Sequence, residues 1–296
     1  MNIIFAREVG LPKYFLRRAA LAIRHILGDG APRLRLPTGK DLILPRDSFF
    51  ARDVYVTNAD VDWGSEALLC KYLDASGDFV DVGANIGYYS AYAAPSVRRV
   101  FSFEPDKRNH APLAANAALT GNVHIHKVAL SSEAGEATLD ASKNSEVSRL
   151  TRNPDATGQN QSVPVMTLDG FASEHPDLRV SGLKIDTEGH ELEILQGGRG
   201  TILRDQPLIL AELMRWPGQG GENEFCALSE FAAALGYAIY GFTPSRPGFL
   251  RPGRFRLAHF DSVTALSAHA TKMLFLVPAR LHAEFEAESK RGRGAV

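Results

Sequence analysis

Short apolar runs alternate with helix-like stretches through the middle of the chain. Five of these runs have the length and composition of strands, and they span residues 78–83, 99–105, 122–130, 182–186 and 207–214. Between them, apolar residues at helical spacing predict helices over Ile86–Ala94, Asp106–Leu119 and Glu188–Gln196. Strands separated by helices of this length form βαβ units around a parallel sheet that is covered on both faces. We therefore expect an α/β fold with a doubly wound, mostly parallel sheet.

Two departures interrupt this alternation. Residues 131–168 contain β-like runs on either side of a loop rich in Ser, Asn, Thr and Gly, at about 143–161, and this pattern predicts a β insertion. Long polar loops in compact enzymes often cover a site. Further along, a glycine-rich loop precedes a helix near Glu224–Leu235, and closing strands are expected at 236–242 and 272–278.

Changes in this pattern along the sequence divide the chain into three parts. Residues 1–75 form an N-terminal extension, with a hairpin over Arg33–Pro45 and a helix over Ser65–Leu73. The main domain covers 76–285. Residues 286–296 are small and charged, so we expect a flexible tail.

The extension also contains an amphipathic segment, PKYFLRRAALAIRHILG, at 12–28. Its apolar face carries Phe15, Ala19, Ala22 and Ile26, with Leu16, Ala20, Ile23 and Leu27 beside it, and its basic residues are Lys13, Arg17, Arg18 and Arg24. Such a helix either lies on an anionic membrane or caps the main domain. The second interpretation is favoured, because basic amphipathic helices are common on soluble proteins.

Composition and charge exclude several classes of protein. The chain has 296 residues, is 45% hydrophobic and 23% charged, and has a net charge of -1, which indicates no general affinity for nucleic acid. Its two cysteines, Cys70 and Cys226, form no metal or disulfide pattern and fit a reducing cytosol. The chain has neither a signal-peptide pattern nor an apolar run of about 18 residues, the length of a membrane span. We therefore expect a cytoplasmic protein.

The strongest local signal is the turn in FVDVGANIGYYS. An apolar strand ends at Asp81 and Val82, and Gly83 and Gly87 then allow a tight turn into a helix. This Gly-x-x-x-Gly spacing differs from the Gly-x-Gly-x-x-Gly of dinucleotide sites. An acid before the turn repels phosphate, and it suits a ligand that carries a cationic amine and a sulfonium.

An acidic partner for this turn follows at the end of the next strand. Glu104 stands twenty-one residues after Gly83, where a carboxylate can accept hydrogen bonds from the hydroxyls of a ribose. Together with Asp81, these residues indicate a nucleoside site without a pyrophosphate clamp. The purely structural alternative is that the glycines serve only the turn and Glu104 is a surface residue.

Six segments occur in the order that is found in methyltransferases of the FkbM type: FVDVGANIGYYS, VFSFEPD, KVALSSEAGEATL, VPVMTLD, GLKIDTEGHELEILQGG and LILAEL. The chain resembles that family from about Phe79 to Met214. The resemblance implies a class I, Rossmann-like methyltransferase fold that binds S-adenosylmethionine, with a seven-stranded sheet whose last strand is antiparallel. It implies a cofactor site lined by Asp81, Gly83, Ala84, Asn85, Gly87, Glu104 and Pro105. It also implies methylation of a hydroxyl on a sugar, a glycolipid or a secondary metabolite.

The segment KIDTEGHE supplies the candidate catalytic groups. Asp186 ends one strand and Glu212 ends the strand expected beside it, at the edge where open α/β sheets bind their ligands. Asp186 is the first choice as base, with Glu212 as its partner and His190 as the alternative base. If Glu188 converges with the two acids, the three side chains could bind Mg²⁺.

Structural roles compete with these assignments. Glu188 can instead be a charge at a helix N-terminus, and His190 can be a solvated helix residue. The pattern places Glu191 on the outer face of the same helix. A nicotinamide-dependent oxidoreductase and a non-catalytic nucleoside-binding protein of the same fold are the rival functions. The expected partner is a small-molecule or glycan acceptor.

Overall fold

The structure is a computed structural model that describes residues 6, 8–26, 31–140, 149–151, 160–212, 222–246, 249–267 and 271–291. Most of the polar loop predicted at 143–161 and most of the glycine-rich loop before Glu224 lie outside these residues. No helix of the described residues is long and apolar enough to cross a bilayer.

The central sheet has eight strands within the described part of the chain, in the order β5-β4-β3-β10-β11-β14-β12-β13. Their bounds are β3 (Asp78–Val82), β4 (Arg99–Phe103), β5 (Val123–His126), β10 (Val180–Ile185), β11 (Leu208–Glu212), β12 (Tyr237–Arg246), β13 (Arg254–His259) and β14 (Met273–Pro278). Strands β5 to β11 in this order pair in parallel, and β14 runs antiparallel to both of its neighbours. The predicted mostly parallel sheet with an antiparallel last strand is confirmed. β13 adds an edge strand that the sequence did not predict.

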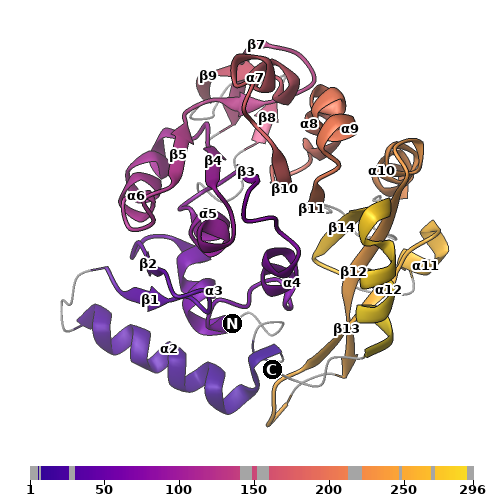
Figure 1. Cartoon of the computed structure of the whole chain (residues 1–296). Coiled ribbons are helices and arrows are strands. Elements are labelled where there is room, and N and C mark those ends of the chain that lie inside the picture. The colour runs from indigo at the N-terminus through magenta and orange to yellow at the C-terminus, as the bar shows by residue number, and fades with distance from the viewer. Residues whose placement is uncertain are drawn as a thin grey trace.

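Helices cover both faces of this sheet (Figure 1). One face carries α4 (Ser65–Lys71), α5 (Tyr88–Ala93) and α12 (His282–Arg291), and the other carries α7 (Leu168–Glu174), α8 (Glu191–Gly197), α9 (Arg199–Asp205) and α10 (Glu222–Ala234). Side chains alternate along β3, so that Phe79 packs into the first layer while Val80 and Val82 pack into the second. This double burial explains why the central strands read as continuous apolar runs. The remaining helices are α6 (Lys107–Ala117), α11 (Val263–Ser267) and the short 3-10 turns η1 (Ala94–Ser96) and η2 (Ala279–Leu281).

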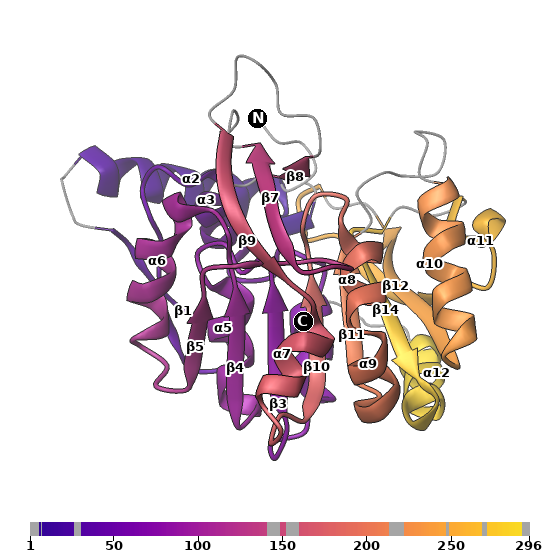
Figure 2. The same ribbon diagram turned by 90° about the horizontal axis from the view of Figure 1, so that it is seen from above.

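The insertion forms a second sheet of four strands in the described residues. Its order is β6 (Ala129–Leu130), β9 (Asn160–Met166), β7 (Gly135–Asp140) and β8 (Arg149–Thr151). Figure 2 shows β7 and β9 in front of the central sheet, on the side of α7. The single strand predicted over 122–130 is wrong, because the chain leaves the central sheet after His126 and resumes pairing in the second sheet.

The first 75 residues share one core with the main domain. The predicted hairpin is present as β1 (Arg33–Arg35) and β2 (Asp41–Ile43), and it is followed by α3 (Phe49–Thr57), which the sequence did not predict. Leu34 and Leu42 of the hairpin belong to the same buried cluster as Phe79 of β3. Helix α2 (Leu11–Ile26) packs outside α3 (Figure 1).

The flexible tail predicted from residue 286 is wrong for the described residues 286–291. Helix α12 continues to Arg291, because Phe285 is buried against the sheet and Glu288 pairs with Lys71. The tyrosine hydroxyl of Tyr72 also donates to Glu288, at 3.2 Å. These contacts offset the polar composition that suggested disorder.

Candidate active site

The glycine turn brings the ends of two neighbouring strands close together. Gly83 has a φ of +73°, and a Cβ atom there would lie 1.9 Å from the carbonyl oxygen of Asp186. Gly87 has a φ of +86°, and its Cβ would lie 2.8 Å from the side chain of Leu113. Both positions therefore need glycine for backbone conformation and for space.

The backbone amides of this turn donate hydrogen bonds to other groups of the protein. The four amides in question belong to Gly83, Ala84, Asn85 and Gly87. The first two donate to the carbonyl oxygen of Phe103, at 3.0 and 3.1 Å, and the third donates to a carboxylate oxygen of Glu104, at 2.7 Å. The fourth donates to the carbonyl oxygen of Ala84, at 2.8 Å. A pyrophosphate cradle needs unpaired amides, so these four do not form one.

Glu104 lies at the mouth of the turn and is 5% exposed. Its carboxylate accepts hydrogen bonds from the amides of Asn85 and Asp106, at 2.7 and 2.8 Å, and from the side chain of Asn109. Burial raises the pKa of Glu104 to about 7, although these donors oppose the shift. A carboxylate has about four lone-pair sites, so at least one remains for a ligand hydroxyl. Pro105, which follows, is half-buried.

Asp81 lies beneath the turn and has no exposed surface. The hydroxyl of Ser90 donates to one carboxylate oxygen, and Nζ of Lys184 is 3.6 Å from the other. Burial raises the pKa of Asp81, while the charge of Lys184 and the Ser90 hydrogen bond lower it in part. These contacts suit a residue that holds Lys184 in place better than one that touches a ligand.

Lys184 is a site residue that the sequence reasoning missed. It is the cross-strand neighbour of Asp81, and its Nζ donates to the carbonyl oxygen of Gly83 at 3.0 Å and lies 3.3 Å from Oδ2 of Asp186. Burial alone would lower the pKa of Lys184, but the carboxylates of Asp186 and Asp81 raise it, so the side chain is an ammonium. Its signal was a lysine inside an apolar strand, two residues before an acid and therefore on the same face.

Asp186 and Glu212 meet as predicted, because Ile185 pairs with Ala211 in the residues just before them. Burial and the nearby charge of Asp186 raise the pKa of Glu212 well above its usual range. Oε2 of Glu212 is buried without a hydrogen-bond partner in the described structure. The carboxyl group of Glu212 therefore holds its proton more tightly than an exposed glutamic acid does.

The loop after Asp186 differs from the prediction. The expected helix at Glu188 begins at Glu191 instead, because Glu188 and Gly189 have φ values of +59° and +99°. Glu191 was predicted to point outward, and this is wrong because the side chain is buried. Its carboxylate accepts hydrogen bonds from the amide and hydroxyl of Thr187 and from the amide of Gly189. A left-handed glutamate is strained, and such residues often lie at functional sites.

His190 is half-buried at the N-terminus of α8. Its Nε2 lies 2.8 Å from the hydroxyl of Ser131, and its Nδ1 lies 3.8 Å from Glu193. The first contact joins His190 to the residue that follows β6 of the second sheet. The second sheet also lies near Glu104, because the Gln161 side chain of β9 donates to Asp106 at 3.2 Å.

The hypothesis of a magnesium site gets no support from the described residues. No three His, Cys, Asp or Glu side chains among them are arranged to hold a metal ion. The ammonium of Lys184 already lies beside Asp186 and Asp81 and offsets part of their charge.

The N-terminal extension adds an acid that the sequence reasoning did not consider. The hydroxyl of Tyr89 donates to Oδ2 of Asp62 at 2.7 Å, and Nζ of Lys184 lies 5.3 Å from the Tyr89 ring centre. Burial raises the pKa of Asp62; Lys272 and Tyr89 lower it in part, and the charge of Asp186 raises it further. The extension therefore reaches the same edge of the sheet.

Comparison with known proteins identifies a family whose sequence model matches this chain. Residues 81–239, more than half of the chain, match the sequence model of a family described as the methyltransferase FkbM domain. No curated protein matches the chain.

Three solved structures are similar, with low identity. Methyltransferase FkbM from Methylobacillus flagellatus KT is 14% identical with a TM-score of 0.40, and the match covers 90% of this chain and 58% of that protein. Precorrin-6y C5,15-methyltransferase from Geobacter metallireducens GS-15 is 12% identical with a TM-score of 0.38, over 72% and 87% of the two chains. A Streptococcus mutans protein whose crystal structure contains SAH is 10% identical with a TM-score of 0.36, over 72% and 94%. These similarities are too weak to transfer an activity. The family match over residues 81–239, which include the glycine turn and the KIDTEGHE segment, shows that the chain belongs to the FkbM methyltransferase domain family.

Proposed function

We propose that the protein transfers a methyl group from S-adenosylmethionine to a hydroxyl group of a small-molecule or glycan acceptor. The observation that carries this proposal is the Asp186–Glu212 carboxyl pair, which lies beside the glycine turn at the carboxyl edge of the sheet. Ligands of open α/β sheets bind at this edge. Membership of the FkbM family supports methyl transfer as the reaction class.

The residues around the turn fit S-adenosylmethionine in their chemistry. Glu104 has lone-pair capacity left for a ribose hydroxyl, and Oδ1 of Asn85 is buried without a hydrogen-bond partner among the described residues. Among the described residues, the acids at this edge outnumber the buried ammonium of Lys184, which suits a ligand with a sulfonium and an amine. When bound, S-adenosylmethionine supplies an electrophilic methyl carbon.

The chain's own groups would orient the acceptor and take its proton. The carboxylate of Asp186 is the base, and Lys184 fixes its position through a contact of 3.3 Å. Glu212, whose raised pKa favours its protonated form, would donate to Asp186 and set its orientation. Positioning and a base within hydrogen-bond reach supply most of what the displacement needs. His190 contacts Ser131, so Asp186 remains the first choice as base.

The rival oxidoreductase function is disfavoured by the backbone of the turn. A nicotinamide dinucleotide needs amides for its pyrophosphate, and the four amides named above already donate within the protein. Binding of NADH in place of S-adenosylmethionine would support that rival. Cofactor binding without any transfer would support a non-catalytic protein of the same fold.

The test uses Asp186→Asn with Glu230→Gln as the control, because Glu230 is exposed on α10. Transfer of a labelled methyl group is measured on a panel of hydroxylated sugars, glycolipids and secondary metabolites. Loss of a general base lowers turnover by about a hundredfold or more, so we expect that loss in Asp186→Asn with cofactor affinity retained. Turnover equal to that of the control would contradict the assignment.

A further inference from the structure

Exposed apolar side chains gather on one side of the molecule. Among the described residues, eight large apolar side chains are strongly exposed, and seven of them lie on α2 or on segments next to it. These seven are Phe15, Leu16, Ile23, Ile26, Phe49, Phe249 and Leu250. Contiguous apolar exposure of this kind marks an interaction site more often than scattered exposure does.

The exposure of α2 follows from how the helix docks on the domain. Tyr14 and Leu21 are buried, and Nε of Arg17 donates to the carbonyl oxygen of Tyr55 at 2.8 Å. These three residues form a narrow stripe of the helix that faces the rest of the domain. The broad apolar face faces away from it, with Leu16 at 72% and Ile26 at 84% exposure. The helix therefore caps the domain with its narrow stripe and leaves its apolar face without a partner in the described structure.

A second, distant segment extends the same face. The amide of Leu11 at the start of α2 donates to the carbonyl oxygen of Phe249 at 2.8 Å. Figure 1 shows the β12–β13 hairpin reaching past the sheet to this end of α2. Phe249 and Leu250, separated from α2 by more than 220 residues of sequence, thus join its exposed apolar surface.

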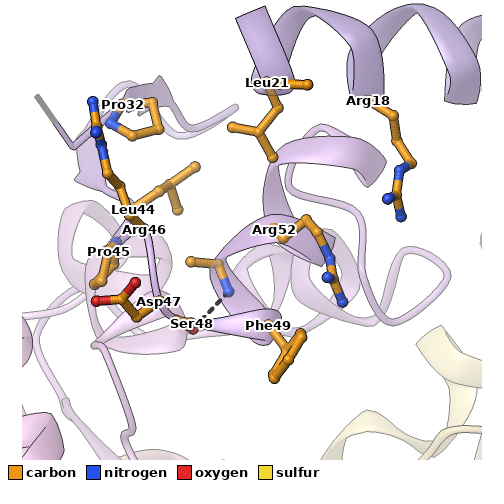
Figure 3. A pocket seen from close by; sticks show the side chains of 12 residues that line it. Arg18, Leu21, Pro32, Leu44, Pro45, Arg46, Asp47, Ser48, Phe49 and Arg52 are labelled. Carbon is orange, nitrogen blue, oxygen red and sulfur yellow. Dashed lines mark hydrogen bonds between the residues drawn. The ribbon is translucent and has the colours of Figure 1, made fainter. Parts of the chain in front are cut away.

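Positive charge borders the apolar face. On a helical projection, Arg18 flanks one edge of the face, while Lys13 and Arg24 flank the other. A cavity of about 430 Å³ opens between α2 and the start of α3. Figure 3 shows Arg18 on α2 and Arg52 on α3 lining its walls, and Arg46 adds a third guanidinium against the single acid Asp47.

We infer that α2 and the 249–250 segment form a docking face for a bilayer that contains anionic phospholipid. The apolar side chains enter the boundary between headgroups and acyl chains, and the flanking basic residues contact lipid phosphates. The helix lies in the plane of the membrane, because its opposite side is packed on α3. A second copy of the chain, the other occupant that an apolar face suits, would not need basic borders on both sides.

The test is flotation of the full chain with vesicles of phosphatidylcholine alone or of phosphatidylcholine and phosphatidylglycerol at about 7:3, at low and high salt. The variants are Leu16→Ser/Ile23→Ser, Phe249→Ser/Leu250→Ser and Arg18→Gln/Arg24→Gln. Leu203→Ser is the matched control, because Leu203 is 49% exposed on α9, away from this face. Sedimentation equilibrium of each variant reports its oligomeric state.

The expected result is binding to anionic vesicles that weakens in high salt and falls at least tenfold in the three double variants but not in Leu203→Ser. Absence of binding by wild type overturns the inference. Equal binding by Leu16→Ser/Ile23→Ser and wild type also overturns it. A dimer that dissociates on the same substitution identifies a second copy as the occupant and overturns it too.

Discussion

Asp186 and Glu212 lie side by side at the carboxyl ends of two neighbouring parallel strands, β10 and β11. Burial and the charge of Asp186 raise the pKa of Glu212 above the ordinary value of 4.5. The folded protein therefore keeps a proton that the unfolded chain releases, and a rise in pH above that value favours unfolding at this site.

Glu212→Gln removes this titration and keeps a donor toward Asp186. Wild type should lose stability at this site as the pH rises from about 5 to about 8, whereas the variant should not. The free energy of unfolding of the variant should therefore increase relative to that of wild type over this range. Urea denaturation at three pH values measures the difference, with the exposed Glu230→Gln as control. Parallel stability curves for Glu212→Gln and wild type would contradict the raised pKa of Glu212.

Lys184 is the counter-ion of two acids, so its removal leaves buried charge without compensation. Lys184→Met is expected to lower the free energy of unfolding by about 3–5 kcal/mol, the usual cost of breaking a buried ion pair from one side. Lys290→Met breaks an exposed pair with Glu286 and should leave the free energy of unfolding nearly unchanged.

The double variant Asp81→Asn/Lys184→Met separates charge from packing. Asp81 has no exposed surface, so neutralising it should recover part of the loss seen in Lys184→Met alone. Urea denaturation of the full cycle measures this coupling. If the two losses simply add, the ammonium does not compensate Asp81.

The edge of the sheet could be predicted from the sequence, because strand ends and glycine spacing follow from local pattern. That pattern placed Gly83, Glu104, Asp186 and Glu212 on one edge, and the structure brings them there. The spacing of Lys184 and Asp186 along one strand was a signal for this residue, but the contact of Lys184 with Asp81 depends on the pairing of two strands, which the sequence of one strand does not reveal.

Other predictions were wrong for the same reason, because they depend on contacts between segments that are distant in the sequence. Glu191 looked like an outward helix residue, but it is buried because it holds the loop that contains Glu188. The end of β5 at His126 and the extension of α12 to Arg291 depend on contacts with distant residues. Helix α2 was predicted correctly as an element, but which of its faces meets the domain was not.

Gly83 and Gly121 provide a matched pair of left-handed glycines. Gly121 has a φ of +87° and open space around it, whereas a Cβ on Gly83 would meet the carbonyl oxygen of Asp186. Gly121→Ala should cost about 1 kcal/mol of stability for its conformation. Gly83→Ala should cost more and should abolish cofactor binding, because β3 and β10 must separate.

Urea denaturation and calorimetric titration of the two variants check this difference. Similar stability losses, or unchanged binding in Gly83→Ala, would show that the close approach of the two strands is not required.

Glu104 gives ligand binding a pH dependence. Its pKa is raised to about 7, and only the ionised form accepts hydrogen bonds with both oxygens. Affinity for S-adenosylhomocysteine should therefore be about tenfold weaker at pH 6 than at pH 8. In Glu104→Gln this dependence should disappear. A dependence that persists in the variant would assign the titration to another group.

The central claim is that Glu104 and the glycine turn bind S-adenosylmethionine. Calorimetric titration of wild type, Glu104→Gln and Glu230→Gln at pH 8 tests it most directly. We predict micromolar-range binding by wild type and by Glu230→Gln, and a loss of about tenfold or more in Glu104→Gln, since hydrogen bonds to a charged group are the stronger ones. Absence of binding by folded wild-type protein, or equal affinity in Glu104→Gln, would contradict the account.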